Sequence, residues 1–388
     1  MISYFIKLAV RIFLHLFYFL PVKQNKIFFS SFDGKSAGCN PLYIFKKLKK
    51  HNQLEFIWCI NRSIKNIDGT KVKTVKHGTI RWILALLTSG TLITNTGFPG
   101  AVPFRKKQLL INTWHGGGAY KKVSLEDKNL VKNKWAVKNE LLADKSISYF
   151  LSSSREFSKI MQKSKKIPEK SFLNTGMPRN DIFFEQNAEL YRELRLKIRG
   201  ELSADNDTLL VLYAPTFRGT SAEGKVPEFP DTSLLKASLS PKFKKKNLLL
   251  FRGHHTFKNI QTAGFDADVS SFDDMQALLC AADVLITDYS SSIWDFSFTE
   301  KPCFIFAPDL KEYEEKRGFC TPPESWGFPL AETNEELHEN ILNFNQNDFS
   351  LKMKQHHTAL GSFENGTASE KTAALILEHC GLKKGESL

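Results

Sequence analysis

The chain alternates short apolar runs with segments of helical periodicity along almost its whole length. Short apolar runs bounded by polar residues are typical of strands buried in a parallel sheet, and helices between them supply the crossovers. The pattern therefore predicts an α/β fold with doubly wound parallel sheets. The predicted strands are Lys26–Ser31, Glu55–Ile60, Lys71–Val75, Thr91–Thr94, Gln108–Thr113, Tyr149–Ser152, Thr208–Tyr213, Leu248–Arg252, Val284–Thr287 and Pro302–Phe306. The predicted helices include Pro41–Lys50, Thr79–Thr88, Ser154–Lys163 and Ala188–Arg199.

A chain of 388 residues is too long for one ordinary domain and suits two. The pattern resets around residues 179–185, where a charged helix precedes a second set of strands. We therefore expect two Rossmann-like domains that face each other across a cleft, over residues 24–185 and 186–388. The last helix of the chain could instead pack back on the first domain. Neither half contains an internal repeat or a G-x-G-x-x-G fingerprint.

The N-terminal stretch before Pro21 is mostly apolar, with Lys7, Arg11 and His15 spaced four residues apart. That spacing places the three side chains along one stripe of a helix, which Pro21 ends. Two cations inside the span make a transmembrane helix costly, and no signal-peptide cleavage pattern follows. Residues 1–23 are therefore predicted to form an amphipathic helix in a membrane interface, with its cations toward lipid phosphates. The alternative is a first helix that packs on the protein's own core.

The chain has a net charge of +13 and a pI near 9.3, which indicates anionic partners. An anionic membrane surface and a phosphate-rich substrate both fit this charge. Nucleic acid is not expected as a partner, because the sequence has no zinc-finger spacing, no aromatic RNA-binding signature and no dominant basic helix. The six cysteines are scattered without a C-x-x-C pair, as in proteins of a reducing cytoplasm.

Polar residues follow four of the predicted strands at the point where each strand ends. Because the carboxyl ends of parallel strands line the ligand-binding edge of such a sheet, these residues are candidates for one site. Histidine and arginine bind and neutralise phosphate, and no carboxylate cage for a metal stands out. The site is therefore expected to hold a diphosphate without an obligatory cofactor, with Mg²⁺ as an optional metal. The four segments are Trp114–Gly118, Ala214–Arg218, Arg252–His255 and Asp288–Ser292.

The most informative of these segments lies within VLITDYSSSIWDF, from Val284 to Phe296. A strand that passes through three serines into a helix presents unpaired backbone N–H groups and hydroxyls, and these together favour an anion. The alternative is that Ser290–Ser292 only cap a crossover helix.

Seven motifs occur in order along the chain: CNPLYIF (Cys39–Phe45), INTWHG (Ile111–Gly116), LYAPTFR (Leu212–Arg218), FRGHH (Phe251–His255), LITDYSSSIWDF (Leu285–Phe296), KPCFIFAPDLKEYEEKRGF (Lys301–Phe319) and ENGTASEK (Glu364–Lys371). Together they resemble the CDP-glycerol glycerophosphotransferases, which include teichoic acid primases and polymerases and their capsule-building relatives. The resemblance covers nearly the whole chain after residue 24. It implies a GT-B type fold, peripheral attachment to the cytoplasmic face of the cell membrane, and transfer of glycerol or ribitol phosphate from a CDP-alditol with release of CMP. The acceptor that it implies is a polyol phosphate, a glycan or a lipid-linked molecule.

This chemistry requires an acceptor hydroxyl to attack phosphorus while CMP departs. A base with a pKa near 7 assists the attack, which makes histidine the natural choice. By resemblance His115 is the candidate base on the acceptor side, with Gly116 beside it in the substrate site; the alternative is a structural histidine. His254 is the second candidate catalytic residue. Arg252 and Arg218 are donors that can stabilise charge on the leaving group.

The remaining candidates bind or orient the substrate. Thr367 and Ser369 begin the last helix and resemble a second helix-start phosphate contact. Asp288 is expected to orient a neighbour or cap the turn, and His255 is a weaker candidate than the histidine before it. The diphosphate is expected to lie against three serines and their amides: Ser290, Ser291 and Ser292.

One departure from the family lies beside the candidate base. Where the family commonly has HGTP, this chain has His115-Gly116-Gly117-Gly118, and glycines let a backbone approach more closely. The change leaves the acceptor open, and CDP-glycerol and CDP-ribitol would present the same cytidine diphosphate to these motifs. Two other functions are a GT-B glycosyltransferase that uses a nucleotide sugar and a non-catalytic membrane-bound protein that binds polyanions.

Overall fold

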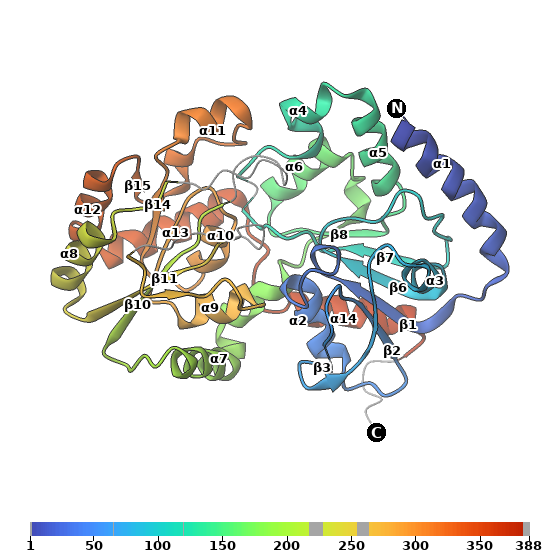
Figure 1. The fold of residues 1–388 in the computed structure, drawn as a ribbon, viewed down its shortest axis with the longest axis horizontal. Helices are drawn as coiled ribbons and strands as arrows, with labels where there is room; N and C mark the ends of the chain where they lie inside the picture. Colours follow the sequence, from blue (N-terminus) through green and yellow to red (C-terminus); the bar gives the residue numbers. More distant parts are fainter. Residues whose placement is uncertain (1, 65, 119, 217–227, 254–263, 383–388) are drawn as a thin grey trace. The chain divides into compact units, whose positions relative to one another are not determined.

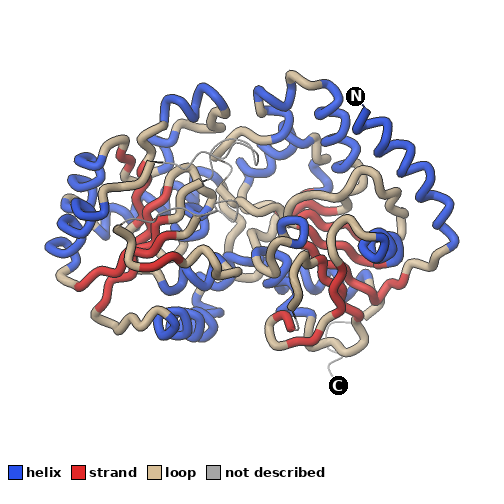
Figure 2. The backbone as a smooth tube through the Cα atoms, viewed as in Figure 1, coloured by secondary structure: helices blue, strands red, loops and turns tan. Residues whose placement is uncertain are grey.

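The computed structural model describes residues 2–64, 66–118, 120–216, 228–253 and 264–382. The chain forms two compact units, each an α/β unit with a parallel sheet (Figures 1 and 2). Unit 1 comprises residues 1–117, 123–181 and 362–388, and unit 2 comprises residues 118–122 and 182–361. The chain thus leaves unit 1 close to the boundary expected at residue 185, and its last helix belongs to unit 1.

Unit 1 is built on a seven-stranded parallel sheet with the strand order β5-β2-β1-β6-β7-β8-β9. The order reverses between β1 and β6, so the carboxyl ends of these two strands form a topological switch point, the place where such sheets bind ligands. Its strands are β1 (Lys23–Ser30), β2 (Glu55–Cys59), β5 (Lys73–Val75), β6 (Ser89–Thr94), β7 (Leu109–Asn112), β8 (Tyr149–Leu151) and β9 (Phe172–Leu173). A small hairpin, β3 (Asn66–Ile67) and β4 (Thr70–Lys71), precedes β5.

All strands predicted for the first half are present, shifted by a few residues at their ends. Polar residues begin several of the helices of unit 1 and satisfy their free N–H groups. Thr79 accepts from the Trp82 amide at the start of α3, and Ser154 accepts from the Phe157 amide at the start of α6. The helices are α1 (Ile2–His15), α2 (Cys39–Leu48), α3 (Ile80–Thr88), α4 (Lys128–Val131), α5 (Lys134–Asp144), α6 (Arg155–Lys165) and α14 (Ala368–His379).

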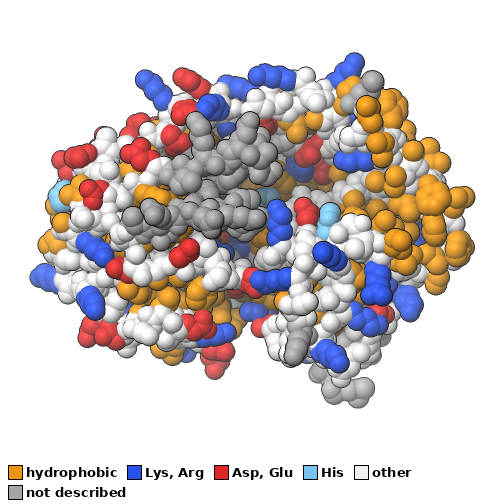
Figure 3. Space-filling view, viewed as in Figure 1, with side chains coloured by type: hydrophobic (Ala, Val, Ile, Leu, Met, Phe, Trp, Pro, Cys, Tyr) orange, Lys and Arg blue, Asp and Glu red, His pale blue; other side chains and the backbone are white. Residues whose placement is uncertain are grey.

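The N-terminal helix α1 orients its arginine differently from the prediction. Arg11 Nη1 donates to the carbonyl oxygens of Gly100 (2.9 Å) and Val102 (2.8 Å), so this nitrogen binds the protein's own backbone. A guanidinium beside unpaired carbonyls satisfies both groups, which explains the change. The apolar side chains of α1 and of the following 3-10 turn instead form an exposed hydrophobic surface (Figure 3). The segment Ile2–Phe19 is long and apolar enough to cross a membrane by length and composition.

Unit 2 is built on a six-stranded parallel sheet with the order β12-β11-β10-β13-β14-β15. The order reverses between β10 and β13, which creates a second switch point. The four strands predicted for this half are present, and the two-residue strands β12 and β15 are additional. The strands are β10 (Thr208–Tyr213), β11 (Lys246–Phe251), β12 (Ala267–Asp268), β13 (Val284–Thr287), β14 (Cys303–Phe306) and β15 (Leu330–Ala331). The helices are α7 (Ala188–Glu201), α8 (Thr232–Phe243), α9 (Met275–Ala281), α10 (Ser292–Ser297), α11 (Leu310–Lys316), α12 (Asn334–Leu342) and α13 (Gln346–Leu360).

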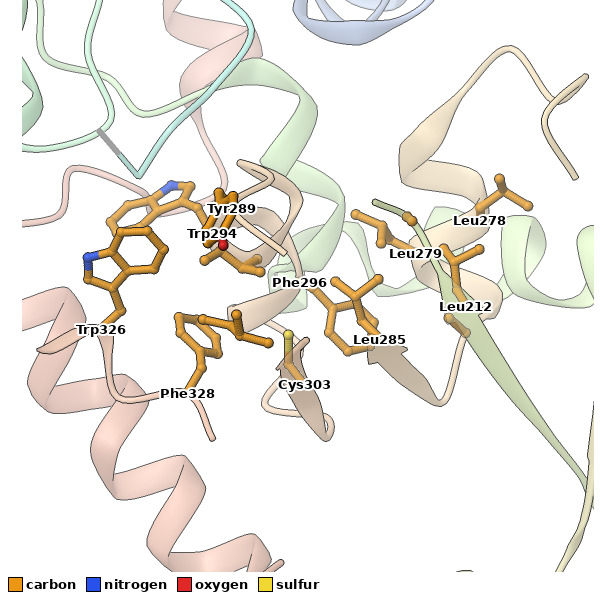
Figure 4. Packing of buried hydrophobic residues seen from close by; sticks show 14 of the residues in the cluster. Leu212, Leu278, Leu279, Leu285, Tyr289, Trp294, Phe296, Cys303, Trp326 and Phe328 are labelled. Atoms are coloured by element: carbon orange, nitrogen blue, oxygen red, sulfur yellow. The ribbon is translucent and has the colours of Figure 1, made fainter. Parts of the chain in front are cut away.

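The core of unit 2 anchors the serine-containing turn from both sides. Leu285 on β13 precedes the turn, and Trp294 and Phe296 on α10 follow it; all three side chains are fully buried (Figure 4). Burial of each such side chain contributes roughly 1.5–3 kcal/mol. The turn between β13 and α10 is therefore fixed by packing at both of its ends.

Candidate functional site

His115 follows β7 and is held at the switch point of unit 1. The carbonyl oxygen of Asn95, which follows β6, lies 2.7 Å from Nδ1 of His115. Because a carbonyl oxygen can only accept, Nδ1 carries the proton and the basic lone pair is on Nε2. The ring of Phe32 also meets the imidazole edge to face, with centroids 5.6 Å apart. These contacts fix both the tautomer and the orientation of the imidazole.

The backbone just before His115 has an unusual conformation. Trp114 has φ 51°, in the left-handed region that non-glycine residues rarely adopt. The fully buried Asn40 supports it by donating from Nδ2 to the carbonyl oxygens of Thr113 and Trp114, each at 3.0 Å. Asn40 had no predicted role, and its place in the CNPLYIF motif is the one sequence feature that marked it.

A buried ion cluster lies behind the imidazole. The Trp114 ring stacks on His115 with centroids 4.7 Å apart, and Lys165 Nζ lies 5.3 Å from the centre of a Trp114 ring. Lys165 pairs with Glu140 at 2.6 Å and with Asp144 at 3.0 Å. Burial raises the pKa of Asp144 to about 6. Burial acts to lower the pKa of Lys165, but attraction to the two carboxylates outweighs it and raises that pKa. This cluster was not predicted.

At one position of the glycine run after His115, a neighbouring side chain leaves no room for a Cβ atom. A Cβ placed on Gly118 would lie 2.0 Å from Cε2 of Tyr120. The Tyr120 ring is buried, and its hydroxyl lies 2.9 Å from Nε2 of His356. Tyr120 therefore fills the space that a side chain at position 118 would need. The carbonyl oxygen of Gly117 accepts from the Ser153 hydroxyl, and Gly116 is half-buried in the same loop.

Asp288 joins the ends of β10 and β13 at the switch point of unit 2. Its carboxylate, which is 1% exposed, accepts from the Thr216 amide at 2.8 and 2.9 Å and from the Thr216 hydroxyl at 2.6 Å. The carboxylate therefore orients the loop that follows β10.

The three serines form a tight turn next to Asp288. The Ser290 hydroxyl oxygen accepts from the Ser292 amide at 3.3 Å and from the Ser292 hydroxyl at 3.0 Å. Ser290 and Ser291 are partly exposed, whereas Ser292 is buried. The Ser292 amide, which was expected to face a phosphate, is thus bonded within the turn.

Arg252 follows β11 in the same unit. Its Nη1 donates to the carbonyl oxygen of Phe272 at 2.9 Å. Burial lowers the pKa of the guanidinium, although Asp274 and Asp273 oppose that shift. Part of the Arg252 side chain therefore serves to hold a neighbouring loop.

The start of α14 already contains an anion from the protein itself. The Asp181 carboxylate accepts from the amides of Ala368 (2.9 Å) and Ser369 (2.7 Å) and from the Ser369 hydroxyl. Both Asp181 and Ser369 are almost fully buried, and the Thr367 hydroxyl donates to Asn365 Oδ1. Asp181 thus occupies the position that the sequence analysis assigned to a phosphate. The whole arrangement belongs to unit 1.

Three of the predicted site residues, Arg218, His254 and His255, lie outside the described residues. Among the residues that the structure describes, no group of three or more His, Cys, Asp or Glu side chains could hold a metal ion.

The chain is similar in sequence to teichoic acid polymerases over nearly its full length. It is 28% identical over 385 residues to a teichoic acid poly(glycerol phosphate) polymerase of Bacillus spizizenii, which covers 95% of this chain and 91% of that protein. It is 26% identical over 373 residues to the Bacillus subtilis polymerase of the same description, covering 92% of this chain but 49% of that protein. The chain therefore spans about half the length of this second relative.

The fold also matches a solved structure of the wall teichoic acid polymerase TagF. The TM-score is 0.81 at 24% sequence identity, and the match covers 98% of each chain. The profile of the family described as CDP-Glycerol:Poly(glycerophosphate) glycerophosphotransferase matches residues 12–378. With its motifs, its fold and this match in agreement, the chain belongs to the CDP-glycerol:poly(glycerophosphate) glycerophosphotransferase family.

Proposed function

We propose that the protein transfers glycerol phosphate or ribitol phosphate from a CDP-alditol to an acceptor hydroxyl and releases CMP, in the synthesis of a teichoic acid or capsule-type polymer. Family membership supports the reaction class. The observation that carries the proposal is the 2.7 Å contact between His115 Nδ1 and the Asn95 carbonyl, because it leaves Nε2 as the base.

The step follows from that tautomer. The acceptor oxygen forms a bond to the phosphorus that bears the alditol while its proton passes to Nε2 of His115. The bond from phosphorus to the bridging oxygen breaks, and CMP leaves with the electron pair. The carbonyl of Asn95 then holds the Nδ1 proton of the imidazolium. The two neighbouring aromatic rings limit rotation of the imidazole.

The donor is proposed to bind to unit 2, in a GT-B type arrangement of two Rossmann-like units. Hydroxyls of the turn after β13 suit phosphate oxygens, and Asp288 fixes the loop beside that turn. His254 and Arg218 are assigned to the donor site by resemblance alone. The amino end of α14 is left out of this proposal, because Asp181 already neutralises it.

The test of this function is His115→Gln, measured as CMP release from CDP-glycerol and CDP-ribitol with an acceptor extract. Loss of the base is expected to lower the rate about 1,000-fold. The matched control is His51→Gln in the same unit, which should keep wild-type turnover. A folded His115→Gln protein with a wild-type rate would exclude His115 as the base.

We also propose that α1 attaches the protein peripherally to the cytoplasmic membrane face. Phe13 and Phe19 are 57% and 77% exposed, so their replacement should leave the fold intact. Phe13→Ser combined with Phe19→Ser is expected to reduce flotation with phosphatidylglycerol vesicles about tenfold, because buried apolar area drives such binding. Ile80→Ser, at a site that is 77% exposed on α3, is the control. Equal flotation of the double variant and the wild type would refute the attachment.

A further inference from the structure

We propose that a cavity at the switch point of unit 1 binds the uncharged, hydroxyl-bearing end of the acceptor, an alditol or sugar unit, through the carboxylate of Asp33. This inference rests on the proposed function and names the acceptor subsite beside its base. The cavity has a volume of about 250 Å³.

The cavity lies where the fold predicts a ligand. Ser30 ends β1 and Thr94 ends β6, and both line the cavity, so it lies at the carboxyl ends of the two strands between which the strand order reverses. The lining residues are Phe28, Ser30, Asp33, His77, Trp82, Leu86, Thr94, Thr96, Gly97, Phe98, Pro99, Glu140 and Ala143.

The same two loops hold the base. Thr94 and Thr96 line the cavity on either side of Asn95, whose carbonyl oxygen bonds His115. Asn95 Oδ1 also accepts from the Phe32 amide at 2.8 Å, and Asp33 is the next residue. The loops that line the cavity therefore also hold the base, and a hydroxyl group that they bind would be presented to His115, as the attacking group must be.

The chemistry of the walls suits a polyhydroxylated molecule. Asp33 is exposed to the cavity, and its Oδ1 accepts from the Thr96 hydroxyl at 2.9 Å. A carboxylate with neighbouring hydroxyls can accept from and donate to adjacent hydroxyls of a ligand. The rings of His77 and Trp82, with centroids 4.6 Å apart, add an apolar surface for the C–H groups between those hydroxyls.

The charge of the cavity argues against phosphate. Its lining residues in the described structure include Asp33 and Glu140 but no Lys or Arg, although the chain as a whole carries a net charge of +13. A phosphate there would face the like charge of two carboxylates, and of the two lysines that attract Glu140, Lys7 and Lys165, the second is already paired with Glu140 and Asp144. The acceptor would thus enter with its uncharged end first and leave its phosphates outside.

The volume limits what can enter. The cavity has room for one alditol or sugar unit, so the site would recognise the terminal unit of the acceptor.

The experiment that tests polyol binding in this cavity compares Asp33→Asn with Asp68→Asn. Both aspartates have positive φ, 54° and 47°, and asparagine tolerates this conformation, so both variants should fold. Asp68 pairs with Lys49 at 2.6 Å on the hairpin and is not part of the cavity lining. Saturation-transfer NMR without any donor would measure binding of glycerol, ribitol and methyl glucoside at up to about 50 mM, the weak range expected of fragments.

The wild type and Asp68→Asn should bind at least one of these polyols, and Asp33→Asn should bind it about tenfold more weakly. Inorganic phosphate should not displace it. Absence of polyol binding to the wild type, equal binding by Asp33→Asn, or displacement by phosphate would overturn the inference.

Activity then separates this inference from the proposed function. With an active acceptor, Asp33→Asn should raise the acceptor KM about tenfold and leave the KM for the CDP-alditol unchanged. A wild-type protein that binds polyols but releases no CMP from either CDP-alditol would refute the function and leave the polyol site standing. An unchanged acceptor KM in an active Asp33→Asn protein would refute the site and leave the function standing.

Discussion

The two switch points of the molecule have the same topology but opposite character. In unit 1, the Asn95 carbonyl holds His115 and the Asn40 side-chain amide holds the Trp114 carbonyl, and a cavity with hydroxyls and carboxylates lies at the carboxyl ends of β1 and β6. In unit 2, the buried carboxylate of Asp288 is engaged by Thr216, and the neighbouring serines bond to each other. The fold thus fixes where a ligand can bind, and the side chains decide which ligand it is.

The two units keep their sites rigid in different ways. Unit 1 fixes one imidazole through main-chain contacts and a strained residue, whereas unit 2 fixes a whole loop through one carboxylate. A change of the holding group should therefore disturb a single side chain in unit 1 and an entire loop in unit 2.

The largest effect in this comparison is expected from Asp288→Ala. The substitution leaves the amide and hydroxyl of Thr216 without their acceptor, at a cost of about 3 kcal/mol to the stability of unit 2. CMP release should fall about 100-fold, because the loop after β10 loses its position. Hydrogen exchange of the β10 and β13 amides would report the stability. Asp288→Asn keeps one acceptor oxygen and should lose less on both measures; a variant ranking in the reverse order would contradict the orienting role.

A smaller effect is expected from the ion cluster that Lys165, Glu140 and Asp144 form in unit 1. It concerns the pH dependence of stability. The pKa of Asp144 is raised from 3.8 to about 6, so the folded protein binds this proton more tightly than the unfolded chain does. Stability contributed by Asp144 should therefore fall as the pH rises from about 4 to about 6. Asp144→Asn should remove that fall in urea unfolding of the protein.

Glu140→Gln is expected to change the pH dependence of stability in the opposite direction. Burial opposes ionisation of Glu140, but the Lys165 ammonium outweighs it and lowers the pKa of Glu140. Its stabilisation is present above its ordinary pKa and is lost as the pH falls through the folded value. If the unfolding free energies of Asp144→Asn and Glu140→Gln changed with pH in the same way, the cluster would not titrate as described.

The strands could be predicted from sequence because each is a short apolar run with polar ends, as in Val284–Thr287. The exceptions are β3, β4, β9, β12 and β15, which have two residues each and are too short to show a pattern. The orientation of Arg11 could not be predicted either, since spacing defines a stripe but not the surface that the stripe faces. The strand-end pattern marked the segments that contain His115 and Asp288, and the family motifs were needed to give His115 its expected role.

The support of the site could not be predicted, because it joins residues that are far apart in the sequence. Asn40 donates to two carbonyl oxygens beside His115 and Asn95 accepts from the imidazole, and none of these contacts leaves a periodic trace in the sequence. Lys165 on α6 meets its two carboxylates on α5 through tertiary contacts between the two helices. Such contacts depend on tertiary structure, which hydrophobic patterning does not encode.

The cap of α14 by Asp181 also bears on how the protein is made. Asp181 leaves the ribosome just before unit 2 begins, and its partners Ala368 and Ser369 follow only after all of unit 2 has been synthesised. A nascent unit 1 would therefore carry the Asp181 carboxylate without the hydrogen-bond donors of α14 throughout that interval. Completion of the first unit must wait for the last helix, so the second unit is free to finish folding first.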